Sequence, residues 1–182
     1  MCYNNAMRIV AGKFKGKQLK DNPYRHIRPT TDKVKQALFT KLQFEILGAR
    51  VLDLFCGTGA LGIEAISRGA SEVVFVDVND RSVRLTKENL ASLKSDAKVI
   101  KGDANVVLGF LDGEFDLILL DPPYQSGLYE KMLTKIGERG LLSEDGTIVC
   151  EHSREDDYCW EPFEVYDEKD YGTITLTYLR RK

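Results

Sequence analysis

The middle of this chain alternates between two kinds of segment, and no other feature restricts the fold as much. Short runs of large apolar residues each precede a segment in which apolar residues recur at helical spacing. The strand-like runs cover 51–55, 73–77, 97–101, 115–120 and 147–151, and the helix-like segments cover 61–67, 82–93, 104–111 and 128–136. This order is typical of βαβ units, so the sequence predicts an α/β fold with a parallel sheet covered by helices on both faces.

The two ends of the chain depart from this alternation. Residues 7–19 alternate irregularly and contain two glycines, which predicts a short β-hairpin. A helix is expected to begin at Thr30, Thr31 or Asp32, because these side chains can cap its first turn, and Gly48 is expected to end it. Near the C-terminus, residues 164–166 and 173–179 flank an acidic turn, which predicts a hairpin with an antiparallel return strand. We therefore divide the chain into an N-terminal hairpin and helix, residues 1–48, and a main domain, residues 49–182.

Charge is distributed unevenly along the chain, although the net charge is only -2. The first 50 residues contain eleven Lys and Arg against three Asp and Glu, whereas the remainder contains fifteen against twenty-five. A basic segment interleaved with Phe14, Tyr24 and glycines suits a polyanion such as nucleic acid. The alternative is an ordinary solvated surface. We expect phosphate contacts from Arg8, Lys13, Lys15, Lys17 and Arg28.

Composition sets further limits on location and cofactor. At 182 residues and 43% hydrophobic, the chain can bury a sizeable core. No window approaches the apolar run of a membrane-spanning helix, and the N-terminus lacks the apolar core of a signal peptide, so we expect a cytoplasmic protein. The four cysteines form no CxxC pair and only two histidines are present. We therefore expect reduced thiols and no bound metal.

A glycine-rich turn follows the first strand-like run. Gly57, Gly59 and Gly62 satisfy the dinucleotide pattern GxGxxG, and Asp77 lies at about the distance from which an acidic residue holds ribose hydroxyls. A dehydrogenase is therefore one interpretation. Asp53 argues against it, because a carboxylate beside a pyrophosphate costs on the order of 1 to 4 kcal/mol in repulsion. A cationic ligand without phosphate, such as S-adenosylmethionine, suits an acidic turn better.

Four aspartates lie at or just beyond the ends of successive strand-like runs. Asp53, Asp77, Asp103 and Asp121 are all predicted at the carboxyl edge of the sheet, where open α/β sheets bind ligands. We expect Asp77 to accept hydrogen bonds from ribose hydroxyls and Asp103 to lie near an adenine amino group. For Asp77 and Asp103 the alternative is a helix N-cap.

The last of these aspartates opens the sequence Asp121-Pro122-Pro123-Tyr124, directly after the apolar run 115–120. Consecutive prolines stop the strand, because they lack a ladder donor and fix φ. A carboxylate, exposed carbonyls and an aromatic ring are suited to holding a flat ring that bears an amino group. An ordinary Pro-rich turn is the alternative for these four residues alone.

Taken together, these motifs resemble the RsmD-type bacterial 16S rRNA guanine-N2 methyltransferases. The resemblance rests on residues 7–16, 28–34, 53–65, 67–70, 121–124 and 171–172. It implies the class I S-adenosylmethionine-dependent methyltransferase fold, a Rossmann-like seven-stranded sheet of order 3-2-1-4-5-7-6 with an antiparallel seventh strand. Two departures are Cys56, where Ala is common in the family, and residues 1–6, which extend beyond the usual start.

The resemblance also implies a reaction, a methyl transfer from S-adenosylmethionine to the N2 amine of a guanine in 16S rRNA. The substrate would be an assembling small ribosomal subunit, and the enzyme a monomer without a metal or a membrane partner. Candidate catalytic residues are Asp121, Pro122, Pro123 and Tyr124; candidate cofactor contacts are Thr30, Asp53, Phe55, Gly57, Gly59, Asp77, Asn79, Asp103 and Ala104. The main alternative is an adenine-N6 methyltransferase acting on DNA or RNA. A dehydrogenase and a non-catalytic RNA-binding module are two further alternatives.

Overall fold

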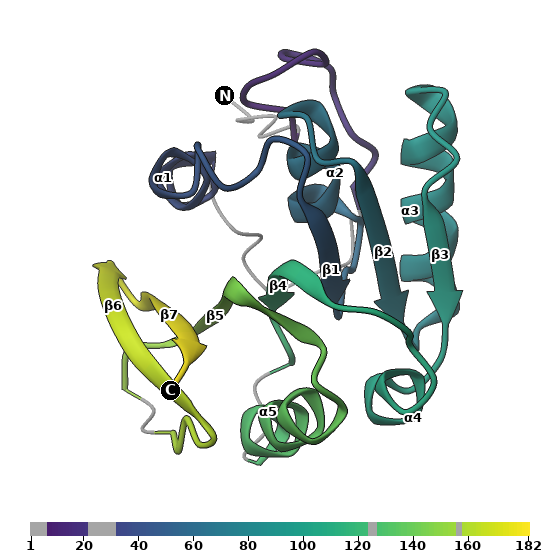
Figure 1. The fold of residues 1–182 in the computed structure, drawn as a ribbon. Coiled ribbons are helices and arrows are strands. Elements are labelled where there is room, and N and C mark those ends of the chain that lie inside the picture. The colour runs from purple at the N-terminus through teal and green to yellow at the C-terminus, as the bar shows by residue number, and fades with distance from the viewer. Residues whose placement is uncertain (1–6, 22–31, 124–126, 156–157) are drawn as a thin grey trace.

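A single mixed sheet organises the fold of the computed structural model, which describes residues 7–21, 32–123, 127–155 and 158–182 (Figure 1). The strands are β1 (Arg50–Leu54), β2 (Glu72–Asp77), β3 (Lys98–Lys101), β4 (Phe115–Leu120), β5 (Leu142–Ser153), β6 (Phe163–Tyr171) and β7 (Ile174–Arg181). The helices are α1 (Asp32–Lys41), α2 (Ala60–Ser67), α3 (Asp80–Ser92), α4 (Ala104–Leu108) and α5 (Leu128–Arg139). The sheet order is β3-β2-β1-β4-β5-β7-β6.

Strand direction follows the predicted pattern. β1 pairs in parallel with β2 and β4, β2 with β3, and β4 with β5, whereas β7 is antiparallel to both β5 and β6. The α/β fold, the strand order and the antiparallel seventh strand are therefore confirmed. The order reverses between β1 and β4, and such a reversal opens a crevice at the carboxyl ends of the strands.

Alternate residues of each central strand enter two separate cores. Val51, Phe75 and Leu117 pack in the core beneath α1, α2 and α3, which also buries Ile9 and Leu19. Leu52 and its neighbours on the other face pack under α4 and α5, on the opposite side of the sheet in Figure 1. Because both faces are covered, the central strands β1, β2 and β4 are mostly apolar, as expected for a parallel sheet. None of the described helices is both long and apolar enough to span a membrane.

The N-terminal helix is shorter than predicted. It begins at Asp32, one of the three predicted caps, while Thr30 and Thr31 lie outside the described residues. It ends at Lys41 and not at Gly48. The N–H of Leu42 still donates to the carbonyl four residues earlier, at Leu38, whereas the N–H of Glu45 donates to the carbonyl three residues earlier, at Leu42, as in a turn. The prediction of the helix end was therefore wrong.

Residues 7–20, which we call the basic arm, form a minimal hairpin. One antiparallel bridge joins Arg8 to Gln18, and the backbone N–H of Leu19 donates to the Met7 carbonyl at 2.8 Å. The arm crosses α2, with Ile9 and Leu19 buried in the same core as the sheet. The division of the chain at residue 48 stays a prediction.

Candidate functional site

The turn that follows β1, residues 55–59, has a backbone that few sequences tolerate. Phe55, Gly57 and Gly59 all have positive φ, at 62°, 57° and 79°. A Cβ added to Gly59 would lie 2.9 Å from the Thr86 methyl group, so both conformation and space require glycine there. Positive φ at Phe55 is unusual for a bulky residue, and such conformations cluster at ligand sites. We call residues 55–59 the glycine turn.

The amide groups of the three glycines Gly57, Gly59 and Gly62 donate to acceptors within the protein itself. The N–H of Gly57 donates to an Asp77 carboxylate oxygen at 2.8 Å, and the N–H of Gly62 donates to Asp53 at 2.8 Å. The N–H of Gly59 donates to the Cys56 carbonyl at 2.7 Å. A dinucleotide pyrophosphate binds through such amides at the helix N-terminus. The three glycine amides are therefore not free to bind a pyrophosphate, which argues against a dehydrogenase although residues 57–62 match GxGxxG.

Asp77, at the end of β2, holds the glycine turn and remains able to accept further hydrogen bonds. One carboxylate oxygen accepts from Gly57 and the other from the Asn79 N–H, both at 2.8 Å. Each carboxylate oxygen has two lone pairs, so acceptor capacity is left for a ligand. Asp77 does not cap α3: Asn79 does, by accepting from the N–H groups of Arg81 and Ser82 at 2.9 and 3.2 Å. The capping alternative for Asp77 was wrong.

Asp103 does cap a helix. Its carboxylate accepts from the Val106 N–H at 3.2 Å at the start of α4, and its side chain is exposed. Ala104, the next residue, is buried. The capping role leaves one carboxylate oxygen of Asp103 outside this bond, so contact with an adenine ring stays a prediction.

Asp53 lies beneath the glycine turn and is only 3% exposed. Burial above all raises the pKa of its carboxyl group to about 7; the Gly62 N–H opposes this rise, and the nearby carboxylates of Asp121 and Asp77 contribute to it. Three of the four strand-end aspartates are thus close enough to interact electrostatically. This negative site, with its partly protonated acid, favours a ligand that carries positive charge.

Two polar side chains of α3, which the sequence analysis missed, hold the glycine turn from below. The Thr86 hydroxyl donates to the Gly57 carbonyl and the Asn89 amide donates to the Thr58 carbonyl, each at 3.0 Å. Both side chains are almost fully buried. A sequence signal existed, because Thr86 and Asn89 interrupt the apolar face that Val83 and Leu90 form on α3.

Residues Asp121, Pro122, Pro123 and Tyr124, which we call the tetrad, begin where β4 ends, as predicted. Asp121 is half-buried, Pro122 is buried and Pro123 is exposed, whereas Tyr124 lies outside the described residues. Burial, with smaller contributions from Cys150 and Asp121, raises the pKa of the neighbouring Tyr129 hydroxyl. That hydroxyl donates to the Glu151 carbonyl at the end of β5.

A cavity of about 240 Å³ opens at the end of β5, the strand that pairs with β4. Its lining residues are His152, Arg154, Tyr158, Trp160, Glu168, Asp170 and Thr175. The rings of Tyr158 and Trp160 both pack near Tyr129, with centroids 4.6 and 5.8 Å from it. The edge of the sheet beside the tetrad is therefore both aromatic and polar.

Four of the five predicted phosphate contacts lie on the basic arm. Lys13, Lys15 and Lys17 are exposed, and the ammonium groups of Lys13 and Lys17 lie 4.9 and 5.1 Å from the centre of the Phe14 ring. Arg8 is exposed and forms an ion pair with Asp32 at 2.8 Å. Arg28 and the candidate cofactor contact Thr30 lie outside the described residues.

Comparison with known proteins finds similarity along nearly the whole chain. The family described as conserved hypothetical protein 95 matches residues 7–180. The putative rRNA methyltransferase YlbH of Bacillus subtilis is 42% identical over 154 residues, which are 82% of this chain and 84% of that protein. Ribosomal RNA small subunit methyltransferase D of Escherichia coli K12 is 30% identical over 179 residues, 97% of this chain and 90% of that protein.

Solved structures show the same fold. The putative methyltransferase yhhF from Escherichia coli superimposes with a TM-score of 0.88 at 30% identity, covering 97% of this chain and 98% of that one. A putative methylase from Haemophilus influenzae gives a TM-score of 0.82 at 29% identity, covering 97% and 99%. The glycine turn and the tetrad therefore lie in a chain whose sequence and fold both match methyltransferases.

Proposed function

We infer the reaction from the family together with one observation of the structure; the chain belongs to the RsmD family of methyltransferases, described as conserved hypothetical protein 95. We propose that it transfers a methyl group from S-adenosylmethionine to the exocyclic N2 amine of a guanine in small-subunit rRNA. The observation that carries the proposal is the placement of two motifs at one sheet edge. The glycine turn held by Asp77 follows β1, and the tetrad follows β4, the strand beside it.

The residues around the glycine turn fit S-adenosylmethionine. That cofactor supplies, when bound, a methyl group on a positively charged sulfur, and it contains no phosphate. Asp77 would accept the ribose hydroxyls with its remaining lone pairs, and the buried Asp53 would favour the positive charge. Phe55, Gly57, Gly59, Asn79, Asp103, Ala104 and Thr30 complete the proposed set of contacts.

The tetrad would make the guanine N2 amine a better nucleophile. The lone pair of a guanine N2 amine is delocalised into the ring, so the nitrogen is a poor nucleophile. The Asp121 carboxylate and the Pro122 carbonyl would accept hydrogen bonds from its two N–H groups and direct the lone pair towards the methyl group, while Pro123 fixes the backbone. As the N–C bond forms and the methyl–sulfur bond breaks, one N–H proton would pass to Asp121 or to solvent. Tyr124 would stack on the base. Catalysis by such a site is largely positioning and electrostatics.

The basic arm would bind the RNA backbone. Exposed lysines on a short hairpin supply phosphate contacts that hold RNA without reading its sequence. The target base must be unpaired or rotated out of a helix, because a paired guanine hides its N2 edge from the tetrad. The names of the two curated relatives, an rRNA methyltransferase and a small-subunit rRNA methyltransferase, support this substrate.

Methyl transfer can be tested directly. The protein is incubated with S-adenosylmethionine carrying a tritiated methyl group, together with naked 16S rRNA or immature small subunits, and the radioactivity in precipitated RNA is counted. We expect incorporation into at least one of the two substrates. If neither RNA incorporates the label, and calorimetry shows binding of NAD but not of S-adenosylmethionine, the result would favour the dehydrogenase alternative.

A further inference from the structure

One buried amide connects two segments that lie far apart in the sequence. Asn89 of α3 is 1% exposed. Its Nδ2 group donates to the Thr58 carbonyl of the glycine turn at 3.0 Å and to the Lys20 carbonyl at 3.1 Å, while its Oδ1 atom accepts from the Lys20 N–H at 2.7 Å. Every hydrogen-bonding group of this side chain is thus shared between the glycine turn and the end of the basic arm.

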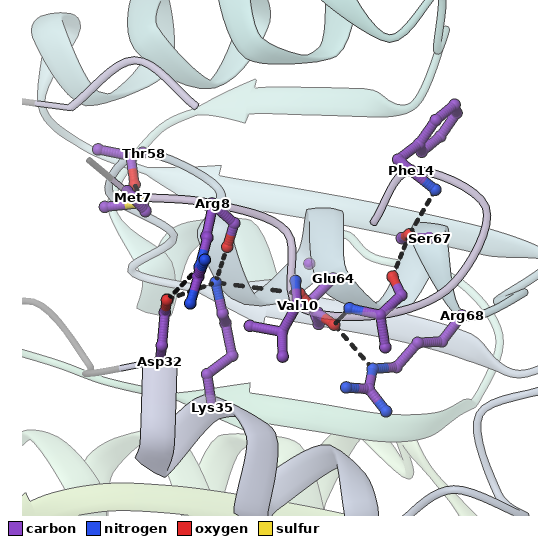
Figure 2. A network of polar contacts seen from close by, with 12 residues as sticks. Met7, Arg8, Val10, Phe14, Asp32, Lys35, Thr58, Glu64, Ser67 and Arg68 are labelled. Carbon is purple, nitrogen blue, oxygen red and sulfur yellow. Dashed lines mark hydrogen bonds and ion pairs between the residues drawn. The ribbon is translucent and has the colours of Figure 1, made fainter. Parts of the chain in front are cut away.

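The other end of the basic arm contacts the same residue of the turn. The Thr58 hydroxyl donates to the Met7 sulfur at 3.3 Å, and Figure 2 shows the two side chains facing each other. Met7 and Leu19 are joined by a backbone hydrogen bond at 2.8 Å, so both strands of the arm reach Thr58 together. Thr58 lies between the two glycines whose conformation shapes the turn.

These contacts are separate from those that fasten the arm to the protein. The fully buried Glu64 of α2 accepts from the N–H groups of Val10 and Ala11 at 2.8 and 2.9 Å. Arg68 donates to the same carboxylate at 2.8 Å, and Lys35 lies 3.9 Å from it (Figure 2). Since Glu64 already anchors the arm, the bonds from Asn89 and Met7 to Thr58 add a connection to the glycine turn.

We propose that Asn89 is a positioning residue that couples the basic arm to the glycine turn, so that RNA and the methyl-donor cofactor each strengthen the binding of the other. The inference rests on the proposed function, in which the arm binds RNA and the turn binds the cofactor. A ligand that holds either segment in place preserves the three Asn89 bonds, and loss of either partner leaves a buried amide unsatisfied. Coupling between two binding sites is necessarily reciprocal.

The test is calorimetric binding of S-adenosylhomocysteine, the unreactive product, with and without saturating RNA. Naked 16S rRNA and immature small subunits are used in separate arms. For the unaltered protein we expect RNA to tighten binding by about fivefold or more, the lower end of common coupling. Asn89→Leu keeps the side-chain size but removes all three bonds. We expect it to weaken binding by roughly tenfold without RNA and to reduce the RNA effect below about twofold.

The matched control is Glu88→Gln, one residue earlier on α3. Glu88 pairs with the Lys20 ammonium at 2.9 Å, so it touches the same arm residue without reaching the glycine turn. This pair is exposed, and exposed pairs contribute little. Glu88→Gln should keep both the cofactor affinity and the RNA effect. If Asn89→Leu does not give a cooperative melting transition, Met7→Leu replaces it, because that change removes only the sulfur acceptor of the Thr58 hydroxyl.

Two outcomes separate the coupling from the proposed function. If RNA and S-adenosylhomocysteine both bind the unaltered protein but independently, or if a folded Asn89 variant behaves like Glu88→Gln, the coupling is refuted and the proposed function stands. If neither RNA substrate binds the unaltered protein, the proposed function fails at its RNA step and the coupling fails with it.

Discussion

The surroundings of Asp53 make the stability of this protein depend on pH. The unfolded chain gives an aspartate a pKa of about 3.9, whereas burial raises the pKa of Asp53 to about 7 in the folded state. Between those two pH values the folded state holds the proton more tightly, so the free energy of unfolding falls as pH rises. A buried acid that costs stability in its charged form is typical of a functional site.

Asp53→Asn should therefore stabilise the protein at pH 8 and change little at pH 4. Asparagine keeps an acceptor for the Gly62 N–H but has no charge, so the gain in unfolding free energy at pH 8 is at most about 4 kcal/mol. Thermal melting at several pH values measures it. The exposed Asp96→Asn serves as the control and should show no such trend. An equal effect of Asp53→Asn at pH 4 and pH 8 would show that its carboxyl titrates normally.

Asp121 should be needed for chemistry and not for cofactor binding. In Asp121→Asn the amide presents hydrogens of its own to the substrate amine, so it no longer accepts on both oxygens. We expect the single-turnover rate to fall roughly 10²- to 10⁴-fold, with S-adenosylhomocysteine affinity within about twofold. Asp112→Asn, at an exposed position before β4, is the control. A rate within threefold of the unaltered protein would remove Asp121 from its proposed role.

At the scale of the elements, the basic arm is a short hairpin fixed to α2, with its lysine side chains exposed. Replacing Lys13, Lys15 and Lys17 together by Gln should lower the salt dependence of RNA binding. Each lost phosphate contact reduces the slope of log K against log salt by about 0.7 to 0.9, so a decrease of about 2 to 3 is expected. The control replaces the exposed Lys98, Lys131 and Lys169. Equal slopes for the two triple variants would locate the RNA elsewhere.

The central strand β4 was predicted from sequence more accurately than the edge strand β6. β4 was predicted at its observed bounds, 115–120, because it is central, apolar and stopped by two prolines. β6 was predicted at 164–166 but extends over Phe163–Tyr171, since its second half is acidic and basic. Charged residues are common on an edge strand, where they discourage pairing with other chains. A strand that contains them does not form a continuous apolar run, so the sequence pattern predicts only part of it.

For the molecule as a whole, the sequence located the candidate site but not the contacts that hold it together. The strand-end aspartates and the glycines follow from motif spacing along the chain. The hydrogen bonds of Thr86 and Asn89 to the glycine turn could not be predicted, because they form only when α3 packs beneath that turn. The contact of Met7 with Thr58 joins residues 51 positions apart, and no local pattern predicts it.

The identity of the modified base tests the central claim most directly. Small-subunit RNA is treated with the protein and S-adenosylmethionine, digested to nucleosides and analysed by mass spectrometry against authentic standards. We predict N2-methylguanosine, and its absence when Asp121→Asn replaces the unaltered protein. N6-methyladenosine in its place would contradict the guanine assignment and favour the adenine alternative, and no new methylated nucleoside at all would contradict the proposed reaction.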